Sequence, residues 1–290
     1  MSSFNKGILY IVIGSLWWGV IGVIYFRSVS FVGSIELVLH RVLWTAVMLI
    51  ATTAYLSKWN KVKKILNIKK NIYYLILTGF LIFINWSVWI YAVSSNQIVD
   101  ASFGYFIMPI LSVLFGYLFF KELLNKRRIF SIILAIISVI YLFYFYKNFP
   151  WIGLTVGLTW SLYNVFRKKI DVDVDLGLLI ESLVILPFAL FGFYLVYETG
   201  NLDFGLNSIN LSLVLTIAGP MTVIPLFFFV KGVLLSGLGP SGMLFFITPT
   251  FQFILGLFLY NEPFDTYRLI GFILIWVAVI VYIFDLYEQN

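Results

Sequence analysis

The stretch GSIELVLHR, residues 33–41, gathers side chains that could exchange protons or bind charge. It holds Glu36, the chain's only histidine, His40, and Arg41 between long apolar runs. In a helix, Glu36 and His40 stand four residues apart and share a face, whereas Arg41 points about 100° away. A histidine beside a carboxylate can titrate near neutral pH, so this pair is a candidate for proton coupling or substrate binding. A structural ion pair is the competing interpretation.

Other polar side chains also interrupt apolar runs. A polar group facing lipid is costly unless it finds a partner, so such groups usually face a protein interior or a wet cavity. We therefore expect these residues, together with the three above, to surround a cavity for a small molecule. The further candidates for substrate binding or coupling are Asn85, Trp89, Asp100, Tyr105, Asn164, Glu181, Thr222, Thr248 and Gln252.

Two prolines fall near the middle of apolar runs. Pro109 and Pro249 each lack an N–H, so one carbonyl four residues earlier loses its helical donor. A freed carbonyl and a local kink suit a ligand site or a gate. A kink relieved by a neighbouring serine or threonine is the alternative.

The composition indicates that the chain lives in a membrane. Of its 290 residues, 62% are hydrophobic and only 11% are charged, with a mean hydropathy of +1.01. A soluble domain carries about 25% charged residues. Cysteine is absent and histidine occurs once, so the sequence predicts no disulfide, no metal site and no cofactor. The basic residues lie between apolar runs, which favours a role in topology over a nucleic-acid partner.

Apolar runs of membrane-spanning length predict an all-α membrane protein with ten transmembrane helices. About 20 apolar residues cross about 30 Å of hydrocarbon. No small-residue cleavage site follows the first run, so we expect a helix there rather than a signal peptide. The predicted spans are residues 7–26, 32–56, 71–93, 98–119, 129–146, 150–168, 176–197, 210–231, 238–260 and 268–286.

The basic residues also predict an orientation. Most of the 19 lysines and arginines fall in alternate connections, including residues 58–70, 121–128 and 167–169. Cytoplasmic connections carry such an excess, so both termini are expected in the cytoplasm. The connections on the opposite side hold only Arg27, Lys147 and Arg268.

The two halves of the chain match at a constant offset of 140 residues. Five helices per half is an odd number, so the second half would enter the membrane from the opposite side. We interpret residues 1–146 and 147–290 as inverted repeats, an arrangement typical of transporters that alternate between two open forms. Duplication kept only for folding is the alternative. The matched pairs include Phe106 and Phe246, Pro109 and Pro249, Gly116 and Gly256, Glu122 and Glu262, Arg128 and Arg268, and Gly79 and Gly219.

Two carboxylates occupy mirrored positions in this repeat. Glu36 lies about one turn inside the outer end of the second predicted span, and Glu181 about one turn inside the inner end of the seventh. They could act at the two mouths of a transport path. Helix packing, ion pairing and snorkelling are the alternatives.

Five segments carry a family resemblance: ELVLHRVLW (36–44), NWSVWIYAV (85–93), DASFGYFIMPILSVLFGYLFFKE (100–122), GPMTVIPLFFF (219–229) and TPTFQFILGLFLYNEPF (248–264). In combination they resemble the EamA-type transporters of the drug/metabolite transporter superfamily, most closely the RarD-like branch. The resemblance covers nearly the whole chain. It implies two inverted five-helix halves and a central cavity walled by the first four helices of each half. It also implies movement of amino-acid-like compounds or drugs across the inner membrane.

These observations predict a secondary active or facilitative transporter that moves a small polar or amphipathic metabolite, or a drug of the chloramphenicol class, by alternating access. No Gly-x4-Gly-Lys-Ser/Thr loop is present, so gradients would supply the energy, with protons a candidate coupling ion. We expect a multi-pass protein of the bacterial inner membrane, monomeric or homodimeric, whose partners are substrate and lipid. A channel or a non-transporting scaffold is the alternative. An intramembrane enzyme is disfavoured, because no GxSxG or HExxH motif occurs.

Overall fold

The structure, a computed structural model, describes residues 2–95, 98–145, 151–205, 208–259 and 266–288. Every regular element in these ranges is a helix. The side chains of Asp100 and Arg268 lie outside the described part, as does the whole of Glu262, the predicted counterpart of Glu122. The elements are α1 (Ser3–Leu16), the π-helix η1 (Trp17–Gly22), α2 (Val23–Ser28), α3 (Ser34–Tyr55), α4 (Trp59–Leu66), α5 (Lys69–Ser94), α6 (Ile98–Phe120), α7 (Lys126–Phe145), α8 (Trp151–Lys168), α9 (Val174–Glu198), α10 (Ile209–Thr216), α11 (Ala218–Ser236), α12 (Leu238–Leu244), α13 (Ile247–Phe258) and α14 (Thr266–Glu288).

Long apolar helices make up most of the described chain. Seven segments have the length and composition to cross a membrane, and each coincides with a predicted span. They are Ser3–Ser28, Ser34–Tyr55, Lys69–Ala92, Lys126–Phe145, Val174–Glu198, Ile209–Ser236 and Leu238–Leu255. The other three predicted spans, residues 98–119, 150–168 and 268–286, fall on α6, α8 and α14.

The helix α8 is polar because it lies inside the bundle. It packs against α5 and α6, and its side chains Tyr163, Asn164 and Arg167 are almost completely buried. Its exposed strip is narrow, at Trp151 and Leu158, so its other faces can carry polar side chains that pair inside the protein. Hydropathy alone therefore understates the depth of this segment.

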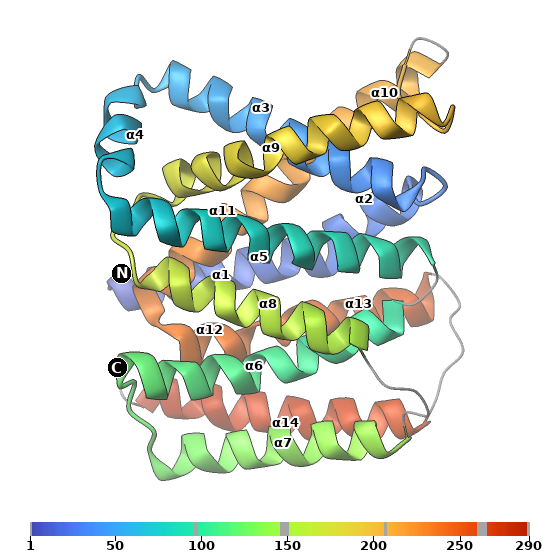
Figure 1. Cartoon of the computed structure of the whole chain (residues 1–290). Coiled ribbons are helices and arrows are strands. Elements are labelled where there is room, and N and C mark those ends of the chain that lie inside the picture. Colours follow the sequence, from blue (N-terminus) through green and yellow to red (C-terminus); the bar gives the residue numbers. More distant parts are fainter. Residues whose placement is uncertain (1, 96–97, 146–150, 206–207, 260–265, 289–290) are drawn as a thin grey trace.

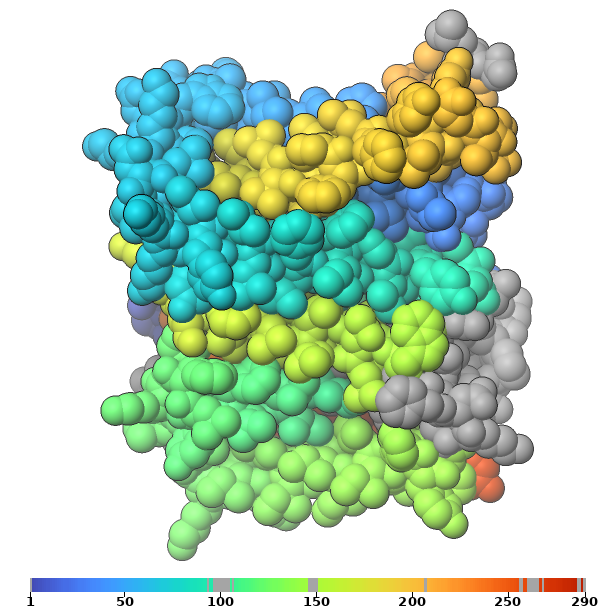
Figure 2. All heavy atoms as spheres, in the orientation of Figure 1, coloured from blue at the N-terminus to red at the C-terminus, as the bar shows by residue number. Residues whose placement is uncertain are grey.

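The helices pack in two rows (Figure 1). In one row the order of neighbours is α9, α5, α8, α6 and α7; in the other it is α3, α11, α1, the α12–α13 pair and α14. The rows touch through α3 with α9, α6 with α12, and α7 with α14. Figure 2 shows the first row as successive bands across one face of the molecule. Each row therefore mixes helices from both halves of the chain.

Two glycines allow close crossings between helices. A Cβ added at Gly219 of α11 would lie 2.5 Å from the backbone oxygen of Trp44 in α3. A Cβ at Gly79 of α5 would lie 3.2 Å from the backbone oxygen of Glu181 in α9. The first distance excludes a side chain without movement of the helices, whereas the second asks for a small adjustment. These are the glycines that match at the offset of 140 residues.

The outward faces of the bundle are apolar. On α7 of the first row, Ile133, Ile137 and Ile140 are exposed, and on α14 of the second row so are Ile273 and Ile280. A soluble monomer rarely exposes an extended apolar surface. Contact with acyl chains accounts for such faces on both rows.

One end of the bundle, which we call the α4 end, carries the ionic contacts between connections. Lys58 pairs with Asp175 at 2.5 Å, and Lys61 pairs with Asp173 at 3.2 Å. The start of α1 and the end of α14 lie at this same end, on the left in Figure 1. The first described helix therefore begins, and the last one ends, at the end of the bundle that carries the basic helix α4.

Candidate functional site

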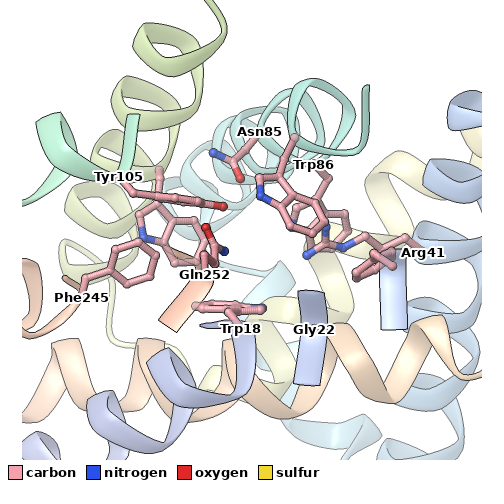
Figure 3. Close-up of a pocket in the computed structure, with 11 residues that line it drawn as sticks. Trp18, Gly22, Arg41, Asn85, Trp86, Tyr105, Phe245 and Gln252 are labelled. Carbon is pink, nitrogen blue, oxygen red and sulfur yellow. The ribbon is translucent and has the colours of Figure 1, made fainter. Parts of the chain in front are cut away.

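A cavity lies between the two rows (Figure 3). The space between protein atoms there is about 470 Å³, a figure that includes the part open to its surroundings. Aromatic rings form most of its wall, and both halves of the chain contribute. Its lining residues are Trp18, Gly22, Phe26, Arg41, Asn85, Trp86, Trp89, Tyr105, Trp160, Phe245 and Gln252. Five of these are site residues predicted from the sequence: Arg41, Asn85, Trp89, Tyr105 and Gln252.

The first helix reaches the cavity through the π-helix η1. Trp18 and Gly22 of this segment both line the cavity. Gly19 lies between them and lets α13 approach, because a Cβ there would lie 3.1 Å from the backbone oxygen of Thr248. Single π-helical turns inside α-helices occur often at functional sites. The sequence WWGVIG gave no signal of this local geometry beyond its glycines.

Arg41 is the one charged residue among the described lining residues. Its side chain is 5% exposed, and its Nε donates a hydrogen bond to Thr222 Oγ1 at 3.0 Å. Its Cζ lies 4.6 Å from the ring centroid of Trp86 and 5.1 Å from that of Phe26. Cation–π contacts of this kind stabilise a desolvated guanidinium. Among the described residues, no carboxylate pairs with Arg41.

Neutral polar groups also belong to the cavity wall, among them those of Asn85, Gln252 and Trp160 and the hydroxyl of Tyr105. Asn85 Nδ2 donates to Val156 O at 2.9 Å and to Thr159 Oγ1 at 3.1 Å, which fixes its orientation. Gln252 Oε1 and Trp160 Nε1 are buried and have no hydrogen-bond partner among the described residues. Buried polar atoms are nearly always paired in folded proteins. Both residues line the cavity, so these unpaired atoms lie in or just behind its wall.

Stacked rings close the cavity toward the α4 end. Trp18 meets Trp160 edge to face at 5.2 Å, and Phe245 lies 6.1 Å from Trp160. Trp160 stacks on Tyr163, the residue three positions nearer the α4 end, at 5.6 Å and 14°. Phe229 packs against Phe245 at 5.2 Å. The cavity therefore ends at this cluster of rings, which we call the aromatic floor.

Glu36 and His40 lie outside this cavity. Glu36 accepts hydrogen bonds from the backbone N–H groups of Asp203 and Phe204, each at 2.8 Å, and lies 3.3 Å from His40 Nε2. Trp44 Nε1 donates to His40 Nδ1 at 3.1 Å. An indole N–H can only donate, so Nδ1 accepts and Nε2 carries the hydrogen that Glu36 accepts. This set of bonds fixes a neutral imidazole and anchors the loop after α9 to α3.

Glu181 lies in a second buried network, nearer the α4 end. It accepts from Thr78 Oγ1 at 2.7 Å and from Tyr163 OH at 3.1 Å, and it lies 3.4 Å from Arg167 Nε. The sequence reasoning treated Arg167 as a topology signal and missed Thr78. The repeat could have drawn attention to Arg167, because Phe166-Arg167 matches Phe26-Arg27 at the offset of 140 residues.

Glu122 ties three helices together at the α4 end. Its carboxylate accepts from the backbone N–H groups of Leu238 and Gly239, each at 2.8 Å, and from Lys168 Nζ at 2.6 Å. The chain turns into α12 at Gly237, whose φ of +100° favours glycine. The end of α6, the end of α8 and the start of α12 therefore meet on one carboxylate.

The remaining predicted site residues lie beside the cavity or outside the described side chains. Thr222 touches the cavity only through Arg41. Asn164 is buried, with Nδ2 donating to Trp160 O at 2.9 Å and Oδ1 unpartnered among the described residues. Thr248 Oγ1 donates to Ser15 O at 3.0 Å. The side chain of Asp100 is not among those described.

The two prolines have different local settings. Pro109 lies inside the continuous helix α6. Pro249 lies just after a break between α12 and α13, and the carbonyl of Phe245 accepts a hydrogen bond from Thr248 N at 2.9 Å. The break falls at the level of the cavity, since Phe245 lines it. A neighbouring backbone donor thus satisfies the carbonyl that Pro249 leaves free.

The chemistry of the cavity is that of binding. It offers one guanidinium, two amides and aromatic faces, without a nucleophile paired to a base among its described residues. Within the described part of the chain, no cluster of three or more His, Cys, Asp or Glu side chains could hold a metal ion. The arrangement can recognise a small molecule by charge, hydrogen bonds and ring contacts.

Known proteins resemble the chain over nearly its whole length. Residues 5–144 match the EamA-like transporter family. An uncharacterized transporter of Vibrio cholerae is 33% identical, over 97% of this chain and 93% of its own. Protein RarD of Salmonella typhi is 31% identical, over 99% of this chain and 97% of its own. A solved crystal structure shares the fold, with a TM-score of 0.67 at 13% identity over 96% of this chain and 97% of its own. The chain belongs to the EamA-like transporter family and is RarD-like within it.

Proposed function

We propose that the chain is a secondary active or facilitative transporter that moves a small polar or amphipathic metabolite across the bacterial inner membrane by alternating access. The observation that carries this is the cavity in which Arg41, Asn85 and Gln252 lie among aromatic rings, between two rows of apolar helices. Amino-acid-like compounds and chloramphenicol-class drugs are the substrates that the family resemblance suggests.

We further propose ten membrane spans in two inverted halves, residues 1–146 and 147–290. The packing order supports this. Along one row, the helices at the seventh, third, sixth, fourth and fifth predicted spans follow one another; along the other row lie the second, eighth, first, ninth and tenth. Each position in one row thus holds the five-span counterpart of the same position in the other. A two-fold relation between the halves generates this order.

Both termini are proposed to be cytoplasmic. The α4 end carries Lys58, Lys61, Lys63 and Lys64 beside the start of α1 and the end of α14. Basic connections favour the cytoplasmic side. On this assignment, the α4 end faces the cytoplasm and the loop after α9 faces outward.

The cavity then lies on the outer side of a closed inner half. Between the cavity and the cytoplasm stand the aromatic floor at Trp160, the Glu181 network and the contacts of Glu122 with Lys168 and α12. Alternating access would require these contacts to separate while a seal forms on the outer side. Because the His40 ring bonds Trp44 and Glu36, and Glu36 holds the loop after α9, we assign His40 a structural role and leave Glu181 and Asp100 as candidates for proton coupling.

Uptake into proteoliposomes tests the proposal. Purified full-length protein would be given radiolabelled amino acids, amines, organic acids and chloramphenicol, with and without a pH gradient. A carrier gives saturable uptake and counterflow, in which unlabelled substrate inside accelerates entry of the label. A channel gives flux without counterflow, and a scaffold gives no flux above that of empty liposomes; either result would refute the proposal.

A further inference from the structure

Arg41 carries a buried positive charge that nothing described in the protein neutralises. Its Nε is occupied by Thr222, and no described acceptor bonds its two terminal nitrogens. The residue is 5% exposed and lines the cavity. Figure 3 shows the guanidinium beside Trp86 at one side of that cavity. The terminal nitrogens are therefore left for a molecule inside the cavity.

An unpaired guanidinium at this depth calls for an anion. Burying a charge is costly unless it is paired and hydrogen-bonded, and ring faces offset only part of that cost. The planar fork of a guanidinium matches a carboxylate, which can accept two parallel N–H bonds. A single positive charge in the described lining matches a single negative charge on the ligand.

The other lining residues indicate the chemistry of the rest of the ligand. Gln252 lines the same cavity as Arg41 and Tyr105, and its Oε1 is a buried acceptor without a described partner. It matches an N–H or O–H group on the ligand. Trp18, Trp160 and Phe245 offer ring faces and edges beyond it. Aromatic walls of this kind favour an apolar or aromatic body.

We propose that the cavity binds small organic monoanions: Arg41 takes the carboxylate, Gln252 accepts from an N–H or O–H group, and the contacting rings of Trp18 and Trp160 offer a surface for an aromatic or apolar body. This names the substrate class of the proposed transporter and rests on that function, although binding itself can be measured without transport. The competing explanation is that Arg41 only straps α3 to α11 through Thr222.

Matched acids and amides test the proposal by the quenching of tryptophan fluorescence in purified, full-length protein. The probes are 3-phenylpropionate with 3-phenylpropionamide, and N-acetylphenylalanine with N-acetylphenylalaninamide. We expect each acid to bind at least about tenfold more tightly than its amide, because a charge-assisted, bidentate contact is lost in the amide. Arg41→Gln should bring the two within about twofold, and Arg41→Lys should give an intermediate ratio.

Two further variants sharpen the result. Gln252→Leu should weaken N-acetylphenylalanine, which has an N–H, and leave 3-phenylpropionate unchanged. Lys64→Gln removes one exposed positive charge and should leave every ratio unchanged, which controls for net charge. If Arg41→Gln is not monodisperse, wild type and Arg41→Lys still decide the question.

The proposal is overturned if neither acid binds more tightly than its amide, including the case in which no probe binds, or if the preference survives in Arg41→Gln. The strap explanation would then stand. Failure of the transport proposal looks different: acids bind with the expected preference but show no counterflow in proteoliposomes. Transport of neutral solutes without preference for acids would leave the transport function intact and reject the monoanion site.

Discussion

Arg167 and Glu181 form an ion pair of which neither side chain is more than 2% exposed. Removing one partner leaves a buried charge, so we expect Arg167→Met to lower the free energy of unfolding by about 3 kcal/mol. The double variant Arg167→Met/Glu181→Met should recover most of that loss, since apolar pairs of similar volume replace buried ion pairs well. Thermal unfolding in detergent measures both.

The exposed pair of Lys61 and Asp173 supplies the control for that comparison. Its side chains are 62% and 50% exposed, so Lys61→Met should change stability by less than about 1 kcal/mol. If the double variant is no more stable than Arg167→Met, the loss in Arg167→Met does not come from leaving the Glu181 charge unpaired. It would point instead to a requirement for Arg167 itself, whose Nη1 is buried without a described partner.

His40 is expected to serve the fold rather than proton coupling. Its Nδ1 accepts from Trp44 and its Nε2 faces Glu36, so protonation would break the bond to Trp44. His40→Ala should destabilise the protein by about 1–3 kcal/mol, because Glu36 loses a buried donor. The pH dependence of counterflow between about pH 5.5 and 8.5 should keep its shape. A flattened profile at retained activity would instead make His40 the coupling group.

The residue types in ELVLHR pointed to a buried polar cluster, but not to which of its members line the cavity and which hold a loop. Helical spacing separates Arg41 from the face shared by Glu36 and His40, and in the structure Arg41 lines the cavity while the other two hold a loop. The partners of Glu36 are backbone groups about 167 residues away. Spacing along a helix predicts the face on which a side chain lies. It does not predict a hydrogen-bond partner far away in the chain, because tertiary packing brings that partner near.

At the scale of elements, the α3–α11 crossing depends on Gly219. A Cβ there would lie 2.5 Å from the backbone oxygen of Trp44 and 2.8 Å from its carbonyl carbon. Gly219→Ala should therefore push the helices apart and cost about 1–3 kcal/mol, measured by thermal unfolding. The repeat partner Gly79 approaches only to 3.2 Å, so Gly79→Ala should cost less. Gly205, with nothing within 4 Å, is the neutral control; equal effects at all three positions would contradict the close crossing.

Hydropathy located the helices well because most of them face lipid, and it located their irregularities poorly. The break between α12 and α13 had a signal in Pro249, since a proline removes one helical donor. The π-helix at Trp17–Gly22 had none that a single sequence reveals. The helix α8 was predicted as an apolar run over residues 150–168, and its buried polar side chains were not distinguished from those of the other spans. Its buried polar side chains pair with residues on helices that are distant in the sequence, so the sequence alone does not predict these pairs.

For the whole molecule, the order of the two rows predicts which side of the membrane each connection faces. The absence of cysteine makes this prediction easy to test by labelling. The chain contains no cysteine, so each introduced cysteine is the only one to react. Lys64 and Asp171 lie in exposed connections at the α4 end, and Phe31 and Asn201 lie in exposed connections at the other. One member of each set comes from each half of the chain.

In intact cells, Phe31→Cys and Asn201→Cys should react with a membrane-impermeant maleimide. Lys64→Cys and Asp171→Cys should react only after the membrane is permeabilised, because basic connections stay in the cytoplasm. Reaction of Lys64→Cys and Asn201→Cys on the same side would contradict the inverted halves. Reaction of all four with sides exchanged would keep the repeat and reverse its orientation. With the sides exchanged, the cavity would face the cytoplasm and the contacts of Glu181 and Glu122 would close the outer side. The assignment of Glu181 and Glu122 to the inner seal therefore depends on this labelling.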